Sequence, residues 1–382
     1  MALIVQKFGG TSLNGSLRIK ACVEIIQREL SAGNKVVIVV SAMSGVTDSL
    51  LSDAAEFGRS PLSEVDALIS CGEQMTASIM SMALCAVGVN SRSWLGWQIP
   101  ILTNDTFSDA EILNIDPAKI LLDVNSGVTP VISGFQGVCS GRITTIGRGG
   151  SDTTAAAIAS AIRADRCDIY TDVDYVYTAD PRRVPNVRKL DFISYDEMFE
   201  MSFLGAKVVH SRAVDIARNS RIPMQVLSSF NSSKGTLIQG EKYSYFSGVT
   251  HLPESVSLIN VDCYSALIED FLSDVKGVLH FCFDKDNDVY RILVRSHDKK
   301  NITLFLDENN LSYKVIEDLK AVSMVGMSAM EKTSINPKLL ECISNHDIKI
   351  YMSFSNRISA TVVVENSKFE KSMLAIHKEF SS

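Results

Sequence analysis

The sequence predicts an α/β protein in two parts: a three-layer domain with a mainly parallel sheet over residues 1–240, followed by two smaller α+β units. In the first part, short apolar runs rich in β-branched residues alternate with stretches of helical apolar spacing. Beyond residue 240 the order becomes βαββα and then begins again. The 382 residues of the chain are enough for two or three domains of ordinary size.

The composition is that of a globular protein without basic character. Hydrophobic residues make up 46% and charged residues 21%, and the formal net charge is −7, so no global basic field attracts nucleic acid or an anionic membrane. No apolar run reaches the ~18 residues that a membrane span needs, and the start MALIVQKFGG lacks the features of a signal peptide. The eight cysteines contain no CxxC pair, so we expect free thiols and a cytoplasmic protein.

The elements of the first part follow from hydrophobic periodicity. Val36–Val40 is a run of five β-branched residues, which is typical of a central parallel strand. Further strands are expected at Leu3–Phe8, Thr129–Ser133, Ile143–Ile146, Cys167–Thr171 and Met224–Ser228. Helices are expected at Leu17–Leu30, from about Ser63 to Val87, and over the Ala-rich stretch Thr153–Ala164. This alternation implies a mainly parallel sheet with helices on both faces.

The second part reads as two units, 250–318 and 319–382. The first has expected strands at Val256–Asp262, Gly277–Phe283, Val289–Arg295 and Ser312–Glu317, with helices at Ser265–Ser273 and Lys299–Asn310. The second has strands at Ala321–Met327, Ile348–Phe354 and Ile358–Val364, with helices at Pro337–Asn345 and Phe369–Phe380. Units of this kind pack their helices on one face of an antiparallel sheet.

Two glycine-rich segments lie at strand-to-helix junctions. In KFGGTS, Gly9 and Gly10 let the backbone approach a ligand closely, and Lys7 places a cation at the end of a buried strand. In GRGGSDT, Arg148 suits bidentate recognition of a carboxylate or phosphate, and Ser151 or Asp152 suits a helix N-cap. The second segment has the spacing neither of a Walker A loop nor of the dinucleotide-binding fingerprint. A tight turn remains an alternative explanation for the first pair of glycines.

Other polar residues follow predicted strands or interrupt a predicted helix. The segment Tyr170–Arg183 leaves a strand as a polar loop whose tyrosines and arginines suit a nucleotide, although it also reads as a solvated loop. Ser41 and Thr47 follow the strand Val36–Val40, at the strand end where open α/β sheets bind ligands. Glu73 lies beside a glycine inside an apolar helical stretch and would pair well with an amine, although it also reads as a solvated charge on a helix.

Together these segments resemble the aspartate kinases of the amino-acid kinase family. The resemblance runs from Leu3 to about Ile238 through the strings VQKFGGTS, VVSAMSGVTD, SCGEQM, ISGFQGV, TTIGRGGSDTTA, DIYTDVDYVYTADPR, AKVVHSRA and GTLI. The two C-terminal units resemble the ferredoxin-like ACT regulatory domains of that family. The resemblance implies transfer of the γ-phosphoryl group of ATP, with Mg²⁺, to the β-carboxylate of L-aspartate, the first step towards lysine, threonine and methionine.

The resemblance also implies roles for individual residues. The catalytic residues would be Lys7, Asp152 and Lys207. The residues that bind aspartate would be Ser41, Thr47, Glu73, Arg148, Gly149 and Ser151. The residues that bind ATP would be Lys7, Gly9, Gly10, Ser12, Thr171, Asp172, Tyr177, Arg182 and Lys207. We identify no protein ligand for Mg²⁺. A site built from cations and glycines is chemically sensible, because a carboxylate is already a nucleophile and phosphoryl transfer depends mainly on positioning and electrostatics.

Three alternatives remain open. A related kinase of this fold could act on glutamate, an N-acylated amino acid, carbamate or a nucleotide. An aspartate kinase could serve one specialised pathway. A non-catalytic scaffold is disfavoured because the charged residues of the motifs are present. We expect a homodimer or homotetramer formed through the ACT-like units, whose sheet edges need partners.

The regulatory units depart from the family pattern. A proline-glycine turn usually follows the first strand of ACT domains that sense lysine or threonine, but here Asp262–Ala266 and Ala329–Thr333 stand at those places. The Ser-Glu step before a later strand is replaced by Ser355–Asn356. These differences predict weak or no inhibition by lysine or threonine.

Overall fold

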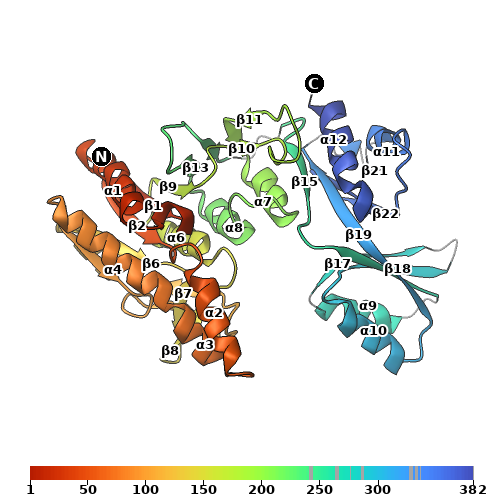
Figure 1. Ribbon diagram of the computed structural model, residues 1–382, viewed down its shortest axis with the longest axis horizontal. Coiled ribbons are helices and arrows are strands. Elements are labelled where there is room, and N and C mark those ends of the chain that lie inside the picture. Colours follow the sequence, from red (N-terminus) through yellow and green to blue (C-terminus); the bar gives the residue numbers. More distant parts are fainter. Residues whose placement is uncertain are drawn as a thin grey trace. The chain divides into compact units, whose positions relative to one another are not determined.

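The computed structural model describes residues 1–240, 244–262, 266–275, 277–284, 288–326, 330–331, 334–335 and 337–381 (Figure 1). The chain forms two compact units. The first comprises Met1–Val176, Lys189–Phe203 and Lys207–Tyr243, and the second comprises Tyr177–Arg188, Leu204–Ala206 and Ser244–Ser382. The finer division at 1–240, 250–318 and 319–382 stays a prediction. No helix in the described part of the chain is both long and apolar enough to cross a membrane.

A mainly parallel sheet forms the centre of the first unit. Its strand order is β12-β14-β13-β9-β1-β2-β6-β3, and only β14 runs antiparallel to its neighbour β13. The strands are β1 (Leu3–Phe8), β2 (Lys35–Val40), β3 (Ser91–Trp94), β6 (Thr129–Ser133), β9 (Arg166–Thr171), β12 (Phe192–Ile193), β13 (Met224–Ser228) and β14 (Thr236–Ile238). The predicted strands β1, β2, β6, β9 and β13 are confirmed.

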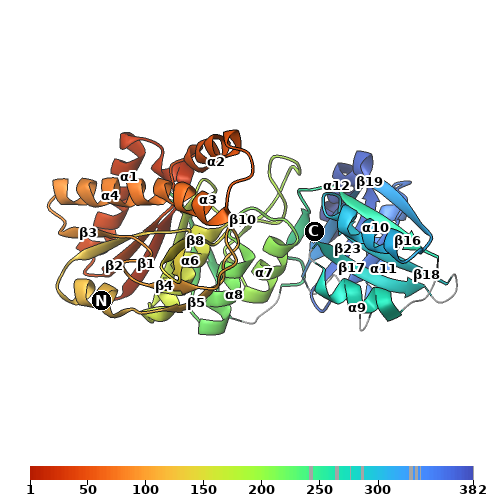
Figure 2. The ribbon, with the colours of Figure 1, turned by 90° about the horizontal axis from the view of Figure 1, so that it is seen from below.

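Helices cover both faces of this sheet, which confirms the three-layer prediction. They are α1 (Ser16–Ser31), α2 (Val46–Glu56), α3 (Leu62–Ile69), α4 (Cys71–Ala86), α5 (Ala118–Asn125), α6 (Gly150–Ala161), α7 (Tyr195–Phe203) and α8 (Ser211–Ser220), with a short 3₁₀ turn η1 (Gly10–Leu13). Apolar residues of α1 and α4 pack with Phe8, Ile38 and Val131. Figure 2 shows these two helices on the same face of the sheet. Helices α5 and α6 pack on the other face.

Three predictions for this unit need correction. The expected helix from Ser63 to Val87 is two helices, because the chain breaks at Ser70: the hydroxyl of Ser70 donates to the carbonyl of Ala67, and the side chain of Gln136 donates to the carbonyl of Ser70. The expected strand Ile143–Ile146 is β8 (Arg142–Thr145), which lies outside the main sheet. It belongs to a separate sheet of order β5-β4-β7-β8, with β4 (Ile101–Thr103), β5 (Ile112–Ile115) and β7 (Gln136–Cys139).

The third correction concerns the start of α6. The sequence predicts a helix from Thr153, capped by Ser151 or Asp152, but α6 begins at Gly150. Its N-cap is Gly149, which has a φ of 67°. Ser151 and Asp152 therefore lie inside the first helical turn and their side chains are buried. The glycine-rich segment supplies the left-handed residue, so the polar side chains are free for other contacts.

The second unit is built on an antiparallel sheet of order β17-β18-β16-β19-β23-β22, in which β15 also pairs with β19. The strands are β15 (Gly248–His251), β16 (Val256–Val261), β17 (Val278–Asp284), β18 (Val289–Arg295), β19 (Tyr313–Val325), β22 (Met352–Ser355) and β23 (Ser359–Glu365). The helices are α9 (Ala266–Asp274), α10 (Lys299–Glu308), α11 (Pro337–Ser344) and α12 (Phe369–Phe380), with a 3₁₀ turn η3 (Asn366–Lys368). Short strands complete the set: β10 (Val176–Tyr177), β11 (Lys189–Leu190), β20 (Met330–Glu331) and β21 (Ser334–Ile335).

One long strand joins the two predicted halves of this sheet. The sequence predicts separate strands at Ser312–Glu317 and Ala321–Met327, but β19 runs through both without a break, and Met327 lies outside the described residues. No proline or glycine separates the two stretches. At the junction the pairing with β16 shifts register by one residue: Val256 pairs with Leu319, and Leu258 pairs with Ile316. The strand β22 is shorter than the predicted Ile348–Phe354.

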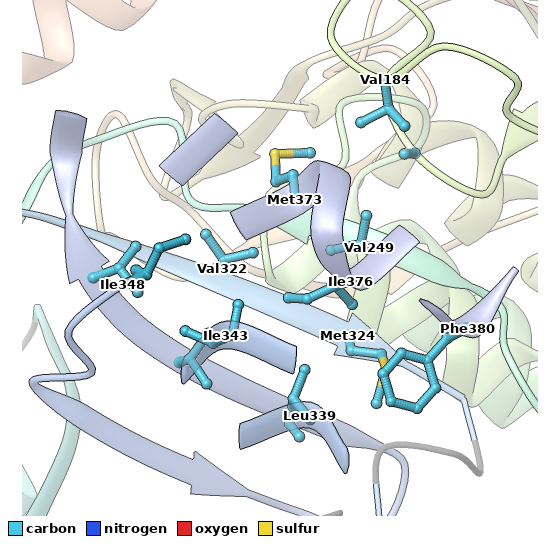
Figure 3. Packing of buried hydrophobic residues seen from close by; sticks show 14 of the residues in the cluster. Val184, Val249, Val322, Met324, Leu339, Ile343, Ile348, Met373, Ile376 and Phe380 are labelled. Carbon is cyan, nitrogen blue, oxygen red and sulfur yellow. The ribbon is translucent and has the colours of Figure 1, made fainter. Parts of the chain in front are cut away.

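Each half of the sheet has its own helical layer. Helices α9 and α10 contribute Ile268, Leu272, Ile302 and Leu306 to one core. Helices α11 and α12 pack Leu339, Ile343 and Ile376 against Val322 and Met324 of β19 (Figure 3). The second half takes its outer strand from β15, which precedes the first half in the chain. This is the α+β arrangement that the sequence predicts, with helices on one side of antiparallel strands.

Candidate functional site

The carboxyl ends of the parallel strands meet at one edge of the first unit's sheet. Gly9 follows β1, Ser41 follows β2 and Gly134 follows β6, while Asp172 and Ser229 follow β9 and β13. The chain places β2 and β6 on one side of β1 and then returns to place β9 and β13 on the other side. The strand β1 therefore lies where the strand order reverses, which is where open α/β sheets bind ligands.

Lys7 and Asp152 form a nearly buried ion pair at this edge. The Nζ of Lys7 lies 2.6 Å from Oδ1 of Asp152, and the two side chains are 10% and 12% exposed. Asp152 also accepts a hydrogen bond from the backbone N–H of His210 at 3.2 Å. A Cβ added to Gly9 would lie 3.5 Å from the Lys7 Nζ, so the cation is next to the glycine turn. Asp152 therefore holds the ammonium group in place beside the backbone of that turn.

The turn at Gly9 and Gly10 touches the segment after β2. A Cβ at Gly10 would lie 2.8 Å from the carbonyl oxygen of Ala42, and the N–H of Ser44 donates to the carbonyl of Gly10 at 3.3 Å. A larger residue at position 10 would push the two segments apart. The N–H of Ser41 donates to the carbonyl of Phe8 at 3.1 Å, which fixes Ser41 beside the same turn. The predicted phosphate-binding and aspartate-binding segments thus meet directly.

Glu73 is buried in α4 behind the loop that follows β2. Glu73 is only 3% exposed, and its Oε1 accepts a hydrogen bond from the backbone N–H of Ala42 at 2.9 Å. Oε2 is buried and has no hydrogen-bond partner among the described residues. Burial raises the pKa of Glu73 to about 7, although the hydrogen bond from Ala42 and the charge of Lys7 oppose the rise. A carboxylate with one unused oxygen in this setting is suited to bind an ammonium group.

The glycine beside this carboxylate has a packing function. A Cβ at Gly72 would lie 2.7 Å from the Cβ of Ala42, so only glycine lets α4 approach the loop closely enough for the Glu73 hydrogen bond. This explains why a glycine interrupts an otherwise apolar helical stretch despite its helix-propensity cost of about 1 kcal/mol.

The loop before α6 is held by α8. The φ angles of Gly147 and Gly149 are 76° and 67°, and a Cβ at Gly149 would overlap the ring of His210. Arg212 donates to the carbonyl of Ile146 at 3.0 Å and to Oδ1 of Asp109 at 2.6 Å. Burial lowers the pKa of His210, so its ring packs as a neutral group near neutral pH. The loop is thereby fixed in the shape that exposes the residue between its glycines.

That residue, Arg148, is exposed, and its guanidinium has no ion-pair or hydrogen-bond partner within the part of the chain that the structure describes. Ser151 is buried, with its hydroxyl 2.8 Å from the position of a Cβ on Gly134. Thr47 is half-buried in the first turn of α2. Lys207 is exposed between α7 and α8. The roles assigned to these residues stay predictions.

The predicted nucleotide residues fall into two groups. Thr171 and Asp172 lie at the end of β9, and the hydroxyl of Thr171 donates to the Asp172 carboxylate at 3.2 Å. Ser12 is fully buried in η1 and accepts a hydrogen bond from Ser229 at 2.7 Å. Tyr177 and Arg182 belong to the second unit, in a segment whose Ala179 and Val184 enter the core of α11 and α12 (Figure 3). Nucleotide contacts by all these residues stay predictions.

Two supporting groups were not singled out from the sequence. His210 and Arg212 occur in the string AKVVHSRA, which was the available signal, but nothing in the string indicates that they brace the glycine loop. Asp66 is a fully buried carboxylate of α3 that accepts hydrogen bonds from N–H and hydroxyl groups of Ser108 and Thr145. Its only signal is that it stands among apolar residues, between Val65 and Ala67, in an expected helix.

Within the residues described, no group of three or more His, Cys, Asp or Glu side chains is arranged to hold a metal ion. Asp152 is engaged by Lys7, and Asp172 is exposed at the strand ends. The carboxylates at this edge of the sheet therefore form no protein cage for a metal ion within the residues described.

Comparison with known proteins places this site in a family. The model of the amino acid kinase family matches residues 2–228. An aspartokinase of Bacillus sp. strain MGA3 is 38% identical over 402 residues, covering 100% of this chain and 97% of the relative. An aspartokinase of Pseudomonas aeruginosa is 38% identical over 408 residues, covering 100% of this chain and 98% of the relative.

Solved structures agree in fold over the whole chain. Aspartokinase III of E. coli, in complex with aspartate and ADP in the R-state, superposes with a TM-score of 0.84 at 24% identity, and each chain is covered completely. Aspartate kinase of Clostridium acetobutylicum superposes with a TM-score of 0.75 at 23% identity, covering 99% of this chain and 100% of that one. The chain belongs to the amino acid kinase family, and within it to the aspartokinases.

Proposed function

We infer that the protein is an aspartate kinase, which transfers the γ-phosphoryl group of ATP to the β-carboxylate of L-aspartate to give 4-phospho-L-aspartate and ADP. One observation carries this inference. At the carboxyl ends of the parallel strands, the ammonium group of Lys7 is held near Glu73, a buried carboxylate with one oxygen that has no hydrogen-bond partner among the described residues. Lys7 lies beside the glycine turn, and its charge acts on the ionisation of Glu73. Membership of the aspartokinases, over the full length of the chain, supports the same assignment.

The phosphoryl half of the site works by electrostatics. Gly9 and Gly10 offer backbone at close range, and Lys7 is already oriented by Asp152, so little reorganisation is needed as charge moves onto the transferring group. Lys207 is assigned the same role, which is to neutralise charge on the transferring phosphoryl group. Thr171 and Asp172 are assigned to the nucleotide.

The acceptor half of the site recognises a free amino acid. Glu73 binds the α-amino group through its unused oxygen, and Arg148 binds the α-carboxylate with a guanidinium that has no competing partner among the described residues. Ser41, Thr47 and Ser151 position the substrate through hydroxyl groups beside the backbone of Gly149. The β-carboxylate is ionised near neutral pH, so no strong general base is needed for its attack.

The nucleotide enters as its Mg²⁺ complex. The ion neutralises charge on the phosphate oxygens when it is bound. Asp152 and Asp172, which belong to the two acidic motifs at this edge of the sheet, would be the carboxylates that orient it. Assembly into a homodimer or homotetramer through the second unit, and a cytoplasmic location, are further parts of the proposal.

The substrate assignment is tested by ADP release with a panel of acceptors. Purified full-length protein with magnesium and ATP should release ADP with L-aspartate at a rate well above that with L-glutamate, N-acetyl-glutamate, carbamate or UMP. The combination of one anion for the amine and one cation for the α-carboxylate favours a free amino acid over N-acetyl-glutamate, carbamate and UMP. Preference for aspartate over glutamate rests on the similarity to aspartokinases over the full chain. A higher kcat/KM with any other member of the panel would contradict the assignment.

Feedback inhibition offers a separate prediction. E. coli aspartokinase III has been solved with lysine and aspartate in its T-state, whereas lysine and threonine should inhibit this protein weakly or not at all. The residues at 263–265, 329 and 332–333, on which part of this prediction depends, lie outside the described residues. At the remaining place, Asn356 accepts the N–H groups of Ile358 and Ser359, closing the turn between β22 and β23.

The measurement is initial rate at subsaturating aspartate with each amino acid added alone and then both together. We expect less than about twofold inhibition at millimolar concentrations, a shift too small to represent a coupling free energy of 1–3 kcal/mol. Steep inhibition by submillimolar lysine or threonine would show that the replaced residues are dispensable for effector binding.

A further inference from the structure

Arg18, in the first turn of α1, contacts the loop that follows β13. Its Nη2 donates to the carbonyl of Ser229 at 2.7 Å and to the hydroxyl of Ser229 at 2.9 Å. The guanidinium carbon lies 3.7 Å from the ring centroid of Phe230, a half-exposed aromatic residue. Two hydrogen bonds and a stacked ring fix both the position and the plane of the guanidinium.

The contact continues from Ser229 to the glycine turn. The hydroxyl of Ser229 donates to that of Ser12 at 2.7 Å, and the N–H of Ser12 donates to the carbonyl of Gly9 at 3.0 Å. The hydroxyl of Ser229 thus accepts from Arg18 and donates to Ser12, which uses both of its functions. Ser12 and Ser229 are buried, so water does not compete for these bonds. A connected path runs from α1 to the turn beside Lys7.

Helix stability does not explain the place of Arg18. A cation in the first turn of a helix opposes the helix dipole, and α1 has no acidic residue in that turn to offset it. The Nε of Arg18 is buried without a hydrogen-bond partner among the described residues, which costs further free energy. The guanidinium also has no carboxylate partner in the described part of the chain. The helix dipole and the unpaired Nε therefore both disfavour an arginine at this position, and its contacts are all directed to the loop after β13.

We propose that Arg18 is a positioning residue for ATP: through Ser229 and Ser12 it holds the Gly9–Gly10 turn in the conformation that receives the nucleotide phosphates. The proposal rests on the proposed function, because it takes this turn as the phosphate-binding element. Aspartate binding does not depend on this path, since Glu73 is held separately by the N–H of Ala42. Loss of this hydrogen-bonded path should therefore weaken the binding of ATP much more than the binding of aspartate.

The test compares Arg18→Met and Ser229→Ala with the wild-type protein. Each variant should raise the KM for ATP and the Kd for ADP about fivefold, the size expected for one buried hydrogen bond, while the KM for aspartate changes less than about twofold. Because both changes break the same path, the double variant should resemble either single variant and not show the product of their effects. Multiplicative effects would mean that Arg18 and Ser229 act independently, contrary to the proposal.

Arg28→Met is the matched control, because Arg28 is an exposed arginine in the last turn of the same helix. It should leave both KM values and the affinity for ADP unchanged. Calorimetric ADP binding is measured on every variant, so a failure of aspartate turnover in the wild-type protein overturns the proposed function without affecting this comparison. An unchanged ADP affinity in Arg18→Met, or equal losses for ATP and aspartate, would overturn the proposal.

Discussion

Lys7→Ala is expected to lower kcat by about 10³-fold, because it removes a preoriented cation from the place where negative charge moves in the transition state. Lys7 Nζ lies beside Gly9 and is held by Asp152, so no other described side chain takes its exact position. The measurement is ADP release at saturating aspartate and ATP.

The same variant should also unfold more easily, which the sequence alone does not indicate. Without Lys7, the carboxylate of Asp152 is left nearly buried with only the N–H of His210 to satisfy it. An uncompensated charge in such a place should lower the free energy of unfolding by about 3 kcal/mol. Urea unfolding measures this loss as a lower midpoint at an unchanged m-value. Aspartate turnover must therefore be measured at a temperature where the variant is folded.

A second substitution separates the two effects. Adding Asp152→Asn removes the stray charge, while the amide oxygen still accepts from His210, so stability should return towards wild type and kcat should stay low. Lys35→Ala, at the opposite end of the neighbouring strand β2, is the control and should change neither quantity appreciably. Near-normal turnover in Lys7→Ala, or recovery of turnover in the double variant, would rule out the assigned role.

Ionisation of Glu73 should make kcat/KM for aspartate fall at acidic pH. The carboxylate binds an ammonium group only when it is ionised, and burial raises its pKa to about 7 in the free protein. The kcat/KM for aspartate should therefore be about tenfold lower at pH 6 than on its plateau above pH 8. In Glu73→Gln this fall should disappear, and kcat/KM should be low at every pH. A wild-type profile that is flat between pH 6 and 8 would contradict the assignment.

The same carboxylate should lower stability at neutral and alkaline pH. Its pKa is higher in the folded protein, about 7, than the ordinary value of 4.5, so folding favours the protonated form. That contribution is fully present below pH 4.5 and is lost as pH rises through 7. Glu73→Gln should thus raise the free energy of unfolding by about 2 kcal/mol at pH 8 and by much less at pH 5.

Glu64→Gln is the control for both measurements. Glu64 lies on the neighbouring helix α3, where it forms an exposed pair with Arg142, so its removal should change stability by no more than about 0.5 kcal/mol. A loss of stability in Glu73→Gln at pH 8 would indicate that the ionised carboxylate is already paired in the free protein.

Much of the fold was predictable because its elements have strong local patterns. Val36–Val40 and the Ala-rich helix after Gly149 are apparent from residue type alone, and the sequence order of strands and helices predicts the layers. The break at Ser70 depends on a hydrogen bond from Gln136, which is 66 residues away. The continuous strand β19 depends on simultaneous pairing with β16 and β23. Such long-range contacts leave no local pattern in the sequence.

The residues of the site also divide into those that stand out in the sequence and those that do not. Lys7, Glu73 and Arg148 stood out because a charge in a buried strand, an apolar helix or a glycine loop needs a reason. Residues that brace these groups did not stand out, because Arg18 and Arg212 are ordinary helix residues in sequence. Their partners are brought to them only by the folded chain.

The most direct test is chemical identification of the product. Full-length protein, magnesium, ATP and L-aspartate are incubated with hydroxylamine, which traps acyl phosphates as hydroxamates. We expect β-aspartyl hydroxamate, formed in proportion to ADP and absent when Lys7 is replaced by alanine. Release of ADP without this hydroxamate, or its formation from another carboxylic acid in preference to aspartate, would contradict a site in which Lys7 and Glu73 join ATP to aspartate.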